Sequence, residues 1–529
     1  MISSADLMIE ATRTATRAAS DYQQYISSLL TSNSMGAIGG DWQGHFSTAV
    51  DIYHRAYGSD HPKFIDALLT YSDRSSSTEL LNALYERRAV LDSPNRKYTR
   101  RIKEGISLEN ELRYIQENGG SESEVVNKLN EIQDFKIELA NSNSPFFNKM
   151  VNDLGMVRGQ RITPGLIRKQ LLDSTTAFID VNLSLGKIYT TVVTPLRERV
   201  FITSMDKSLR RSLFELNGQE MRKLKLRKAT YHLYDKVLKG AIEWINQERE
   251  IDQLIVTRNK NFTECNFGYF PRQRALSGKN WNEDNLLIHE FAITYAFSIS
   301  TLLASLDVQQ LRQPGQGEFG VFSNTSSAIN REVDLEELDD LFNQQLMEAT
   351  YGNPENRSFH TNTSPSNFIT EVEKFRNVAL VAHGSRDDDD FAKMYIHLAP
   401  DSLSKNGLMG ISEVYNLTLS ANMTLAINCK SGTGITFNNE GPKGFARAFL
   451  AAGSSAVIAG NDNLTDVYTA RVMKNFVDFW IIQKMPAARA VQQAKIKFLE
   501  STDTVYPNTW GELTYYGLPN IYYDHVTTH

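Results

Sequence analysis

The sequence predicts an α/β fold with a mainly parallel sheet flanked by helices, preceded by an α-helical amino-terminal region. Before Arg161 the apolar residues recur at helical spacing, and after Ser366 short apolar runs alternate with helical segments. Strands that alternate with helices along a chain form parallel sheets covered on both faces. A chain of 529 residues is long enough for two or three domains with a large core.

Composition excludes several functional classes. Hydrophobic residues make up 41% of the chain and charged residues 22%, as in ordinary soluble proteins, and the net charge of −6 gives no reason to expect direct binding of nucleic acid. Cys265 and Cys429, the two cysteines, form no disulfide scaffold or zinc pattern. Residues 1–20 lack the apolar core of a signal peptide, and no window approaches ~18 apolar residues, so we expect a cytoplasmic protein without membrane contact.

Residues 1–160 are predicted to form a helical module, with a helical hairpin near 105–140. Ser121 and Glu124 form a capping box. An apolar stripe at helical spacing follows, consisting of Val125, Leu129, Ile132, Phe135 and Leu139. A weaker stripe runs from Ile106 to Ile115, and Gly119-Gly120 supplies the turn between them. Packing alone is the simplest role for this hairpin.

Residues 161–310 are predicted to contain one helix, an antiparallel meander and a further strand. Thr163-Pro164 is a good start for a helix to Leu172. The strands and helices expected after it are a meander at 177–181, 187–193 and 199–202, a long polar helix at 206–247, and a strand at 251–257. Two segments rich in polar and turn residues, 309–324 and 351–366, are predicted to be loops.

Residues 311–529 show the clearest alternation of strands and helices. The predicted order is a helix near 366–374, a strand to Ala382, a helix near 412–417, a strand to Asn428, a helix at 443–452, a strand at 456–459 and a helix at 465–483. In open α/β sheets, chemistry collects beyond the carboxyl ends of such strands.

Two of these strand ends present a histidine and a cysteine. Val378–Ala382 runs into His383-Gly384, and Leu425–Asn428 runs into Cys429 and a glycine-rich turn. An imidazole can take the thiol proton and later return it to a leaving amine, so the pair can serve nucleophilic catalysis. The backbone N–H groups of Gly384 and Cys429 are candidates for the oxyanion hole. The alternative is that Cys429 is only a small buried residue.

The residues around Cys429 resemble the CHAT domain, a caspase-like cysteine protease family related to separase. The resemblance is strong from His383 to Pro519 and fainter before Ile255. The matching motifs are Ala382-His383-Gly384, Thr433-Gly434, Glu440-Gly441, the Ala-Arg-Ala-Phe-Leu run at 446–450, Ala452-Gly453, Asp466 with Thr469 and Met473, Pro507 with Trp510, and Tyr516-Gly517. Two departures stand out. Ile427-Asn428 replaces the family's Ser-Ala before the cysteine, and Gly460-Asn461-Asp462 replaces its Ser-Leu-Trp, which puts substrate specificity in doubt.

The resemblance implies a caspase-like (caspase-hemoglobinase) fold with two halves. An inactive-like half at 161–310 would lack the Cys/His pair, and a catalytic half at 311–529 would contain His383 and Cys429. The implied activity is that of a cysteine endopeptidase that needs no cofactor or metal and cleaves a specific protein partner. Related proteases act in bacterial antiviral defence and cell death, some by activating a pore-forming gasdermin-like protein. The alternative is a non-enzymatic adaptor that uses the same domains for protein–protein interaction.

Two aspartates are candidate substrate-pocket residues. Asp466 matches the family's aspartate in the region that supplies an acidic pocket residue in separase, and Asp462 lies in the preceding departure. An N-cap role for the helix that begins near Asp466 competes with the pocket role. The run Asp387–Asp390 is either a solvated loop or a source of negative potential at the mouth of the site.

The helical module contains one further resemblance. Residues 47–71 look like a single tetratricopeptide unit of the kinesin-light-chain kind, with Gly58, Asp60, His61 and Pro62 in its turn. No 34-residue period is sustained, so a free-standing solenoid is not expected. His61 is therefore interpreted as a turn residue, and a regulatory protein that docks on the module is the expected partner besides the substrate.

Overall fold

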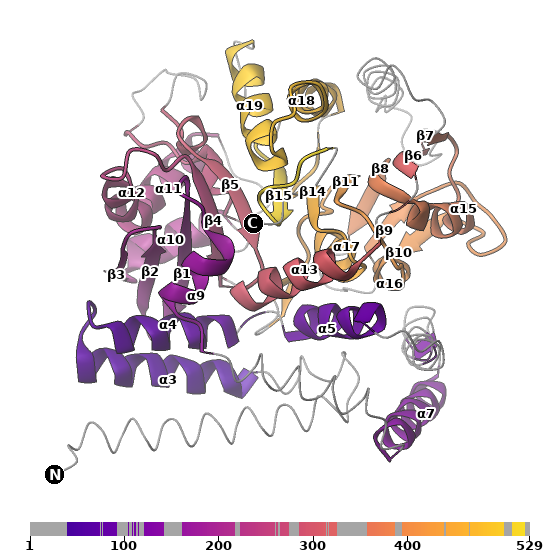
Figure 1. Cartoon of the computed structure of the whole chain (residues 1–529), viewed down its shortest axis with the longest axis horizontal. Coiled ribbons are helices and arrows are strands. Elements are labelled where there is room, and N and C mark those ends of the chain that lie inside the picture. The colour runs from indigo at the N-terminus through magenta and orange to yellow at the C-terminus, as the bar shows by residue number, and fades with distance from the viewer. Residues whose placement is uncertain are drawn as a thin grey trace.

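A central sheet of 13 strands organises the molecule (Figure 1). The structure is a computed structural model and describes residues 40–74, 76, 78–92, 104, 108, 111–112, 115, 121–141, 161–216, 223–259, 261–262, 265–274, 285–313, 315, 317–324, 357–386, 394–437, 441–464, 466–501 and 510–523. The strand order is β10-β9-β8-β11-β14-β15-β5-β4-β1-β2-β3, with β6 paired to β8 and β7 paired to β6. The predicted fold class, a mostly parallel sheet flanked by helices, is confirmed.

The sheet contains two groups of strands, each with a parallel part and antiparallel strands beside it. The first group and its meander are β1 (Thr176–Ser184), β2 (Lys187–Val193), β3 (Glu198–Ser204), β4 (Gln253–Arg258) and β5 (Ala292–Ala296). The second comprises β6 (Gly317–Asn324), β7 (Arg357–His360), β8 (Phe375–Arg386), β9 (Met394–His397), β10 (Leu408–Gly410), β11 (Met423–Ile427) and β14 (Ala456–Gly460). The last strand, β15 (Leu513–Gly517), pairs antiparallel with β14 and parallel with β5. The parallel strands β1, β4 and β5 therefore run in the direction opposite to β6, β8, β11 and β14 within one sheet.

Helices cover the sheet on both sides. Figure 1 shows α18 (Asp466–Val477) and α19 (Ala487–Glu500) on one side, and α5 (Thr78–Asp92) alongside α13 (Ile299–Leu311) on the other. The remaining described α-helices are α3 (Gly40–Tyr57), α4 (Pro62–Arg74), α7 (Glu122–Asn141), α9 (Pro164–Leu171), α10 (Lys207–Leu216), α11 (Lys223–Leu233), α12 (Lys239–Ile245), α15 (Pro365–Glu371), α16 (Ile411–Tyr415) and α17 (Phe445–Ala451). A short hairpin, β12 (Ile435–Phe437) and β13 (Gly441–Lys443), stands apart from the main sheet.

Local signals predicted several of these elements correctly. The Ser121 hydroxyl accepts the Glu124 N–H at 3.3 Å, and the Glu124 carboxylate accepts the Ser121 N–H at 2.7 Å, so the capping box begins α7 as expected. Thr163 caps α9 by accepting the Leu166 N–H at 3.2 Å. The meander β1-β2-β3 is antiparallel throughout, as its turn residues predicted.

Other expectations were wrong. The segment 309–324 is a loop only in part, because 317–324 form β6 beside β8, where Phe319 and Phe322 are fully buried. Likewise, 357–360 within the second predicted loop form β7. Glycine and glutamine favour loops locally, but burial between neighbouring strands outweighs that preference. The helix expected at 206–247 is divided among α10, α11, a π-helical turn and α12, and residues 217–222 lie outside the described ones.

The helical module is joined to the sheet region by long-range polar contacts. Asp73, near the end of α4, accepts the Ser300 N–H at 2.8 Å in the first turn of α13. Arg87 on α5 donates to the Leu417 and Ala451 carbonyls at 2.6 and 3.2 Å. The two contacts tie the module to α13 and to α17, the helix that follows the Cys429 turn.

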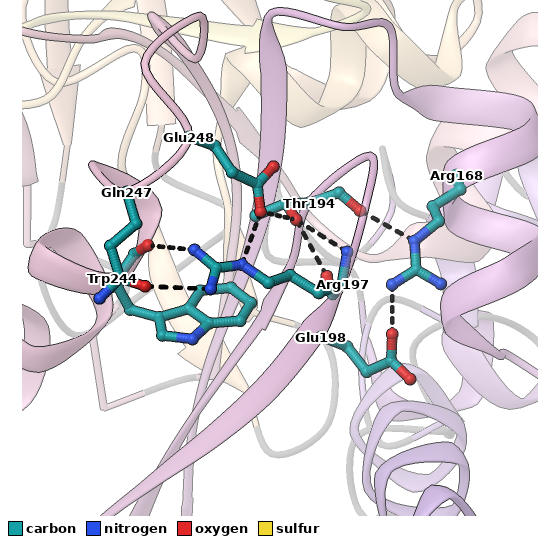
Figure 2. A network of polar contacts seen from close by, with 7 residues as sticks. All are labelled: Arg168, Thr194, Arg197, Glu198, Trp244, Gln247 and Glu248. Carbon is teal, nitrogen blue, oxygen red and sulfur yellow. Dashed lines mark hydrogen bonds and ion pairs between the residues drawn. The ribbon is translucent and has the colours of Figure 1, made fainter.

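A polar network fixes the far edge of the sheet (Figure 2). Arg197, in the turn between β2 and β3, stacks over the Trp244 ring at 4.1 Å and donates to Glu248 at 2.7 Å. Arg168 of α9 pairs with Glu198 of β3 and donates to the Thr194 carbonyl at 2.8 Å. Helices α9 and α12 are thereby held to the same turn, and this network is structural, because it belongs to the strands most distant from His383 and Cys429 in the sheet order.

Candidate active site

Strand register brings His383 and Cys429 to the same level at one edge of the sheet. Parallel strands β8 and β11 pair Val381 with Ile427, and each chain continues two residues further to reach His383 and Cys429. Both residues are partly exposed, while the strands that lead into them are buried. His383 and Cys429 therefore occupy equivalent, partly exposed positions on neighbouring parallel strands.

Close backbone contact joins the two strand ends. A β-carbon on Gly384 would lie 2.4 Å from the Cys429 carbonyl oxygen and 3.3 Å from its amide nitrogen. The buried Asn428 donates its side-chain N–H to the Ala382 carbonyl at 2.8 Å. Asn428, one of the departures from the family pattern, thus cross-links the residues that precede His383 and Cys429.

The turn after Cys429 is held by a buried serine. Lys430 adopts a positive φ of 57°, which reverses the chain directly after the cysteine. The Ser431 hydroxyl is fully buried, lies 2.9 Å from the Ala426 carbonyl oxygen and accepts the Gly460 N–H at 2.9 Å. The cysteine turn is therefore attached to both β11 and β14.

The Cys429 sulfur has one backbone neighbour on the segment after β14. The Leu464 N–H donates to Sγ at 3.4 Å, and the Leu464 carbonyl oxygen lies 4.0 Å from the same sulfur. The contact brings the loop 460–464 directly against the thiol.

Burial lowers the pKa of His383, which favours the neutral imidazole that a general base requires.

A second histidine, His397 on β9, lies directly opposite His383 in the antiparallel ladder, and its Nε2 is 2.7 Å from the Ser385 hydroxyl. Burial lowers the pKa of His397, and so does the charge that His383 carries when it is protonated. Sequence reasoning missed His397. The alternating Met394–His397 segment, typical of a short strand, was the available signal.

The structure describes the two candidate pocket aspartates, Asp462 and Asp466, to different extents. Asp462 is exposed; its carboxylate accepts the Asn463 N–H at 2.8 Å, and its carbonyl accepts the Lys430 N–H at 3.1 Å. It therefore lies in the loop beside the cysteine turn. Asp466 is the first residue of α18, but its side chain lies outside the described residues, as does the whole of 387–390. The acidic pocket stays a prediction.

Other chemistry was sought across the described parts of the chain. Within them, no group of three or more His, Cys, Asp or Glu residues is arranged to hold a metal ion. Cys265 is fully buried, unlike Cys429. No described helix has both the length and the apolar character needed to cross a membrane.

Comparison with solved structures gives distant likenesses. Two separase–securin complexes of Saccharomyces cerevisiae align over 90% of this chain at 10% identity, with TM-scores of 0.46 and 0.47. This chain covers 38% and 37% of those chains, so it spans less than two-fifths of their length. A third structure, described only as a protease, aligns over 57% of this chain and 69% of its own at 8% identity, with a TM-score of 0.36.

Comparison of the sequence with family models assigns the chain to a family, which the structural likenesses do not. No curated protein matches this chain. The family model of the CHAT domain matches residues 186–518, which is more than half of the chain and includes both His383 and Cys429. The protein therefore belongs to the CHAT domain family.

Proposed function

We propose that this protein is a cysteine endopeptidase in which Cys429 is the nucleophile and His383 the general base and acid. The observation that supports the proposal best is the register of β8 and β11, in which His383 and Cys429 each lie two residues beyond the paired Val381 and Ile427. A histidine base must lie within reach of the thiol proton, and equivalent positions on neighbouring parallel strands support that placement.

The reaction follows from these roles. His383 takes the Cys429 proton, and the sulfur attacks the scissile carbonyl carbon to give a tetrahedral oxyanion near the Gly384 and Cys429 N–H groups. The C–N bond breaks as His383 returns the proton to the amine, which leaves a thioester. Water then loses a proton to His383 and attacks the thioester carbon. The C–S bond breaks as His383 returns that proton to the sulfur, which releases the carboxylic acid and the Cys429 thiol.

The test compares single variants of the full-length protein with a peptide library and a thiol-reactive peptidyl probe. Cys429→Ala and His383→Ala should each lose cleavage without loss of fold, because both residues are partly exposed and little core volume is removed. Cys265→Ser is the matched control and should cleave normally. Undiminished cleavage by Cys429→Ala would reject this nucleophile, and absence of any labelling at Cys429 would favour the adaptor alternative.

The substrate we propose is a specific protein in a bacterial defence or cell-death system, such as a gasdermin-like pore former. The support is the resemblance of the residues around Cys429 to proteases of that kind, which is an analogy. Co-incubation with the proteins encoded beside this gene, followed by mapping of new termini, tests it. If none of them is cut while a peptide library is, the defence assignment is rejected and the peptidase remains.

We further propose that a protein docked on the helical module regulates cleavage. Its support is the contact of Arg87 with the carbonyls of Leu417 and Ala451, since Ala451 belongs to α17, the next helix along the chain after the Cys429 turn. A chain that begins at Arg161 should cleave the native substrate at a different rate from the full-length protein. Equal rates for the two folded proteins would show that the module is dispensable.

A further inference from the structure

The loop between β14 and α18 is attached to the cysteine turn by its backbone. The Lys430 N–H donates to the Asp462 carbonyl at 3.1 Å, and the Gly432 N–H donates to the Gly460 carbonyl at 2.7 Å. A third contact, from the Leu464 N–H to the Cys429 sulfur at 3.4 Å, lies at the end of the same loop. Two backbone hydrogen bonds thus fix the loop segment that contains Leu464, whose N–H contacts the thiol.

Core side chains hold the loop from the other side. Asn461 is buried, its N–H donates to the Glu512 carbonyl at 2.9 Å, and its side-chain oxygen accepts the Tyr516 hydroxyl at 2.8 Å. The Tyr516 hydroxyl also lies 3.3 Å from the Gly432 carbonyl oxygen, so one residue of β15 contacts both the loop and the cysteine turn. The Tyr516 ring stacks on Phe297 at 5.7 Å, which limits its movement.

The electrostatic consequence concerns the charged form of the sulfur. An N–H donor directed at a sulfur stabilises the thiolate relative to the thiol, while a nearby carbonyl oxygen does the reverse. The Leu464 donor is the closer of the two, at 3.4 Å against 4.0 Å for its carbonyl. Of these two contacts, the closer one favours the thiolate, which is the reactive form of a cysteine.

We propose that the Leu464 N–H is a catalytic group that holds the Cys429 thiolate, and that Asn461 and Tyr516 are positioning residues for it. The role in catalysis rests on the proposed peptidase function, but the effect on the thiol can be measured without any substrate. Asn461 belongs to the Gly460-Asn461-Asp462 segment, which differs from the family pattern. Residues in which this chain differs from its family therefore also hold the loop in place.

The decisive experiment measures the alkylation rate of Cys429 by iodoacetamide as a function of pH in the full-length protein, with the modified residue identified by mass spectrometry. Wild type should show a midpoint pH clearly below the value near 8.5 of a free cysteine. Leu464→Pro removes the N–H donor and should move the midpoint upward, with a roughly 3- to 10-fold slower reaction at pH 7. Leu464→Ala keeps the N–H and is the matched control, with an unchanged midpoint.

Tyr516→Phe supplies an independent measurement, because it removes one hydroxyl and keeps the stacked ring. Tyr516→Phe should raise the midpoint pH of Cys429 alkylation, as Leu464→Pro does, but by less. If circular dichroism shows that Leu464→Pro is unfolded, the Tyr516→Phe result alone tests the proposal. A wild-type midpoint at or above 8.5, or folded Leu464→Pro and Tyr516→Phe proteins with the wild-type profile, would overturn the inference.

Peptide hydrolysis measured on the same samples separates this inference from the proposed function. A Leu464-dependent midpoint without any hydrolysis would reject the peptidase and leave the thiolate contact standing. If the protein hydrolyses peptides but the midpoint pH of Cys429 alkylation is the same in the Leu464→Pro and Tyr516→Phe variants, only the proposed contact between the Leu464 N–H and the thiolate is rejected.

Discussion

Gly384 and Cys429 are in direct backbone contact, and no side chain fits between them. A β-carbon at position 384 would lie 2.4 Å from the Cys429 carbonyl oxygen, far closer than two such atoms can approach. The obstructing atom belongs to the backbone, so it cannot move aside as a flexible side chain would. Glycine at this position is therefore required for the two strand ends to meet as they do.

Gly384→Ala should reduce peptide cleavage by about 100-fold or more, because it must displace the backbone that aims the two proposed oxyanion donors. Gly165→Ala is the matched control: its β-carbon would meet no atom closer than 3.8 Å, so normal activity is expected. Steady-state kcat/KM and a thermal melt for each variant provide the measurement. A folded Gly384→Ala protein with full activity would contradict the proposed oxyanion site.

Asp466→Asn should lower kcat/KM for substrates with Arg or Lys at P1 if Asp466 and Asp462 line an acidic pocket. Loss of a charged partner in a desolvated pocket corresponds to roughly 1–3 kcal/mol of transition-state binding. A helix-cap role predicts no change, because asparagine caps about as well as aspartate. Cleavage profiling of wild type, Asp466→Asn and Asp462→Asn distinguishes the two roles, and a preference for Leu or Met at P1 that neither variant alters would reject the acidic pocket.

Arg87→Met should weaken attachment of the helical module. Its guanidinium donates to two carbonyls, and burial lowers its pKa to about 10. Loss of those donors should cost about 1–3 kcal/mol in the free energy of unfolding. Arg88→Met is the control: Arg88 forms a partly exposed ion pair with Asp307 at 2.8 Å, and such pairs contribute about 1 kcal/mol or less. Equal urea midpoints for the two variants would contradict the role given to Arg87.

Asp180→Asn should stabilise the protein at pH 8 and have little effect near pH 4. Burial raises the pKa of Asp180 to about 6, although hydrogen bonds from Thr257 and Ser72 oppose the shift. Its second carboxylate oxygen is buried and has no protein hydrogen-bond partner, and its side chain lines a cavity of about 10 Å³, roughly the space of one water.

The sign of this effect follows from proton linkage. The folded protein binds the Asp180 proton more tightly than the unfolded chain, so the stability this group contributes is fully present below about pH 4 and is lost as pH rises through about 6. The gain at pH 8 on substitution by asparagine should be at most about 3 kcal/mol. Urea denaturation of both proteins at pH 4, 6 and 8 provides the measurement, and a gain that does not grow with pH would contradict it.

Local sequence signals predicted much of the fold and part of the candidate site. The strands that lead into His383 and Cys429 were predictable because apolar runs bounded by glycine identify buried strands without knowledge of their neighbours. Segment 317–324 was not, because its glycines and polar residues favour a loop and only its pairing with β8 makes it a strand. His397 was missed for the same reason, since its significance comes from lying opposite His383 in the β8–β9 ladder.

By itself the sequence determined which residues could do chemistry, which buried strands lead into them, and which helices begin at which caps, although β8 continues past the predicted end at Ala382 to Arg386. Those properties depend on spacing and on side chains within a few residues of one another. Only the tertiary structure decided that Leu464 lies against the Cys429 sulfur, that Asp73 meets the start of α13, and that β15 joins two oppositely directed groups of strands. These contacts join residues distant in the chain, and they form only when the strands and helices pack together to bury the common core.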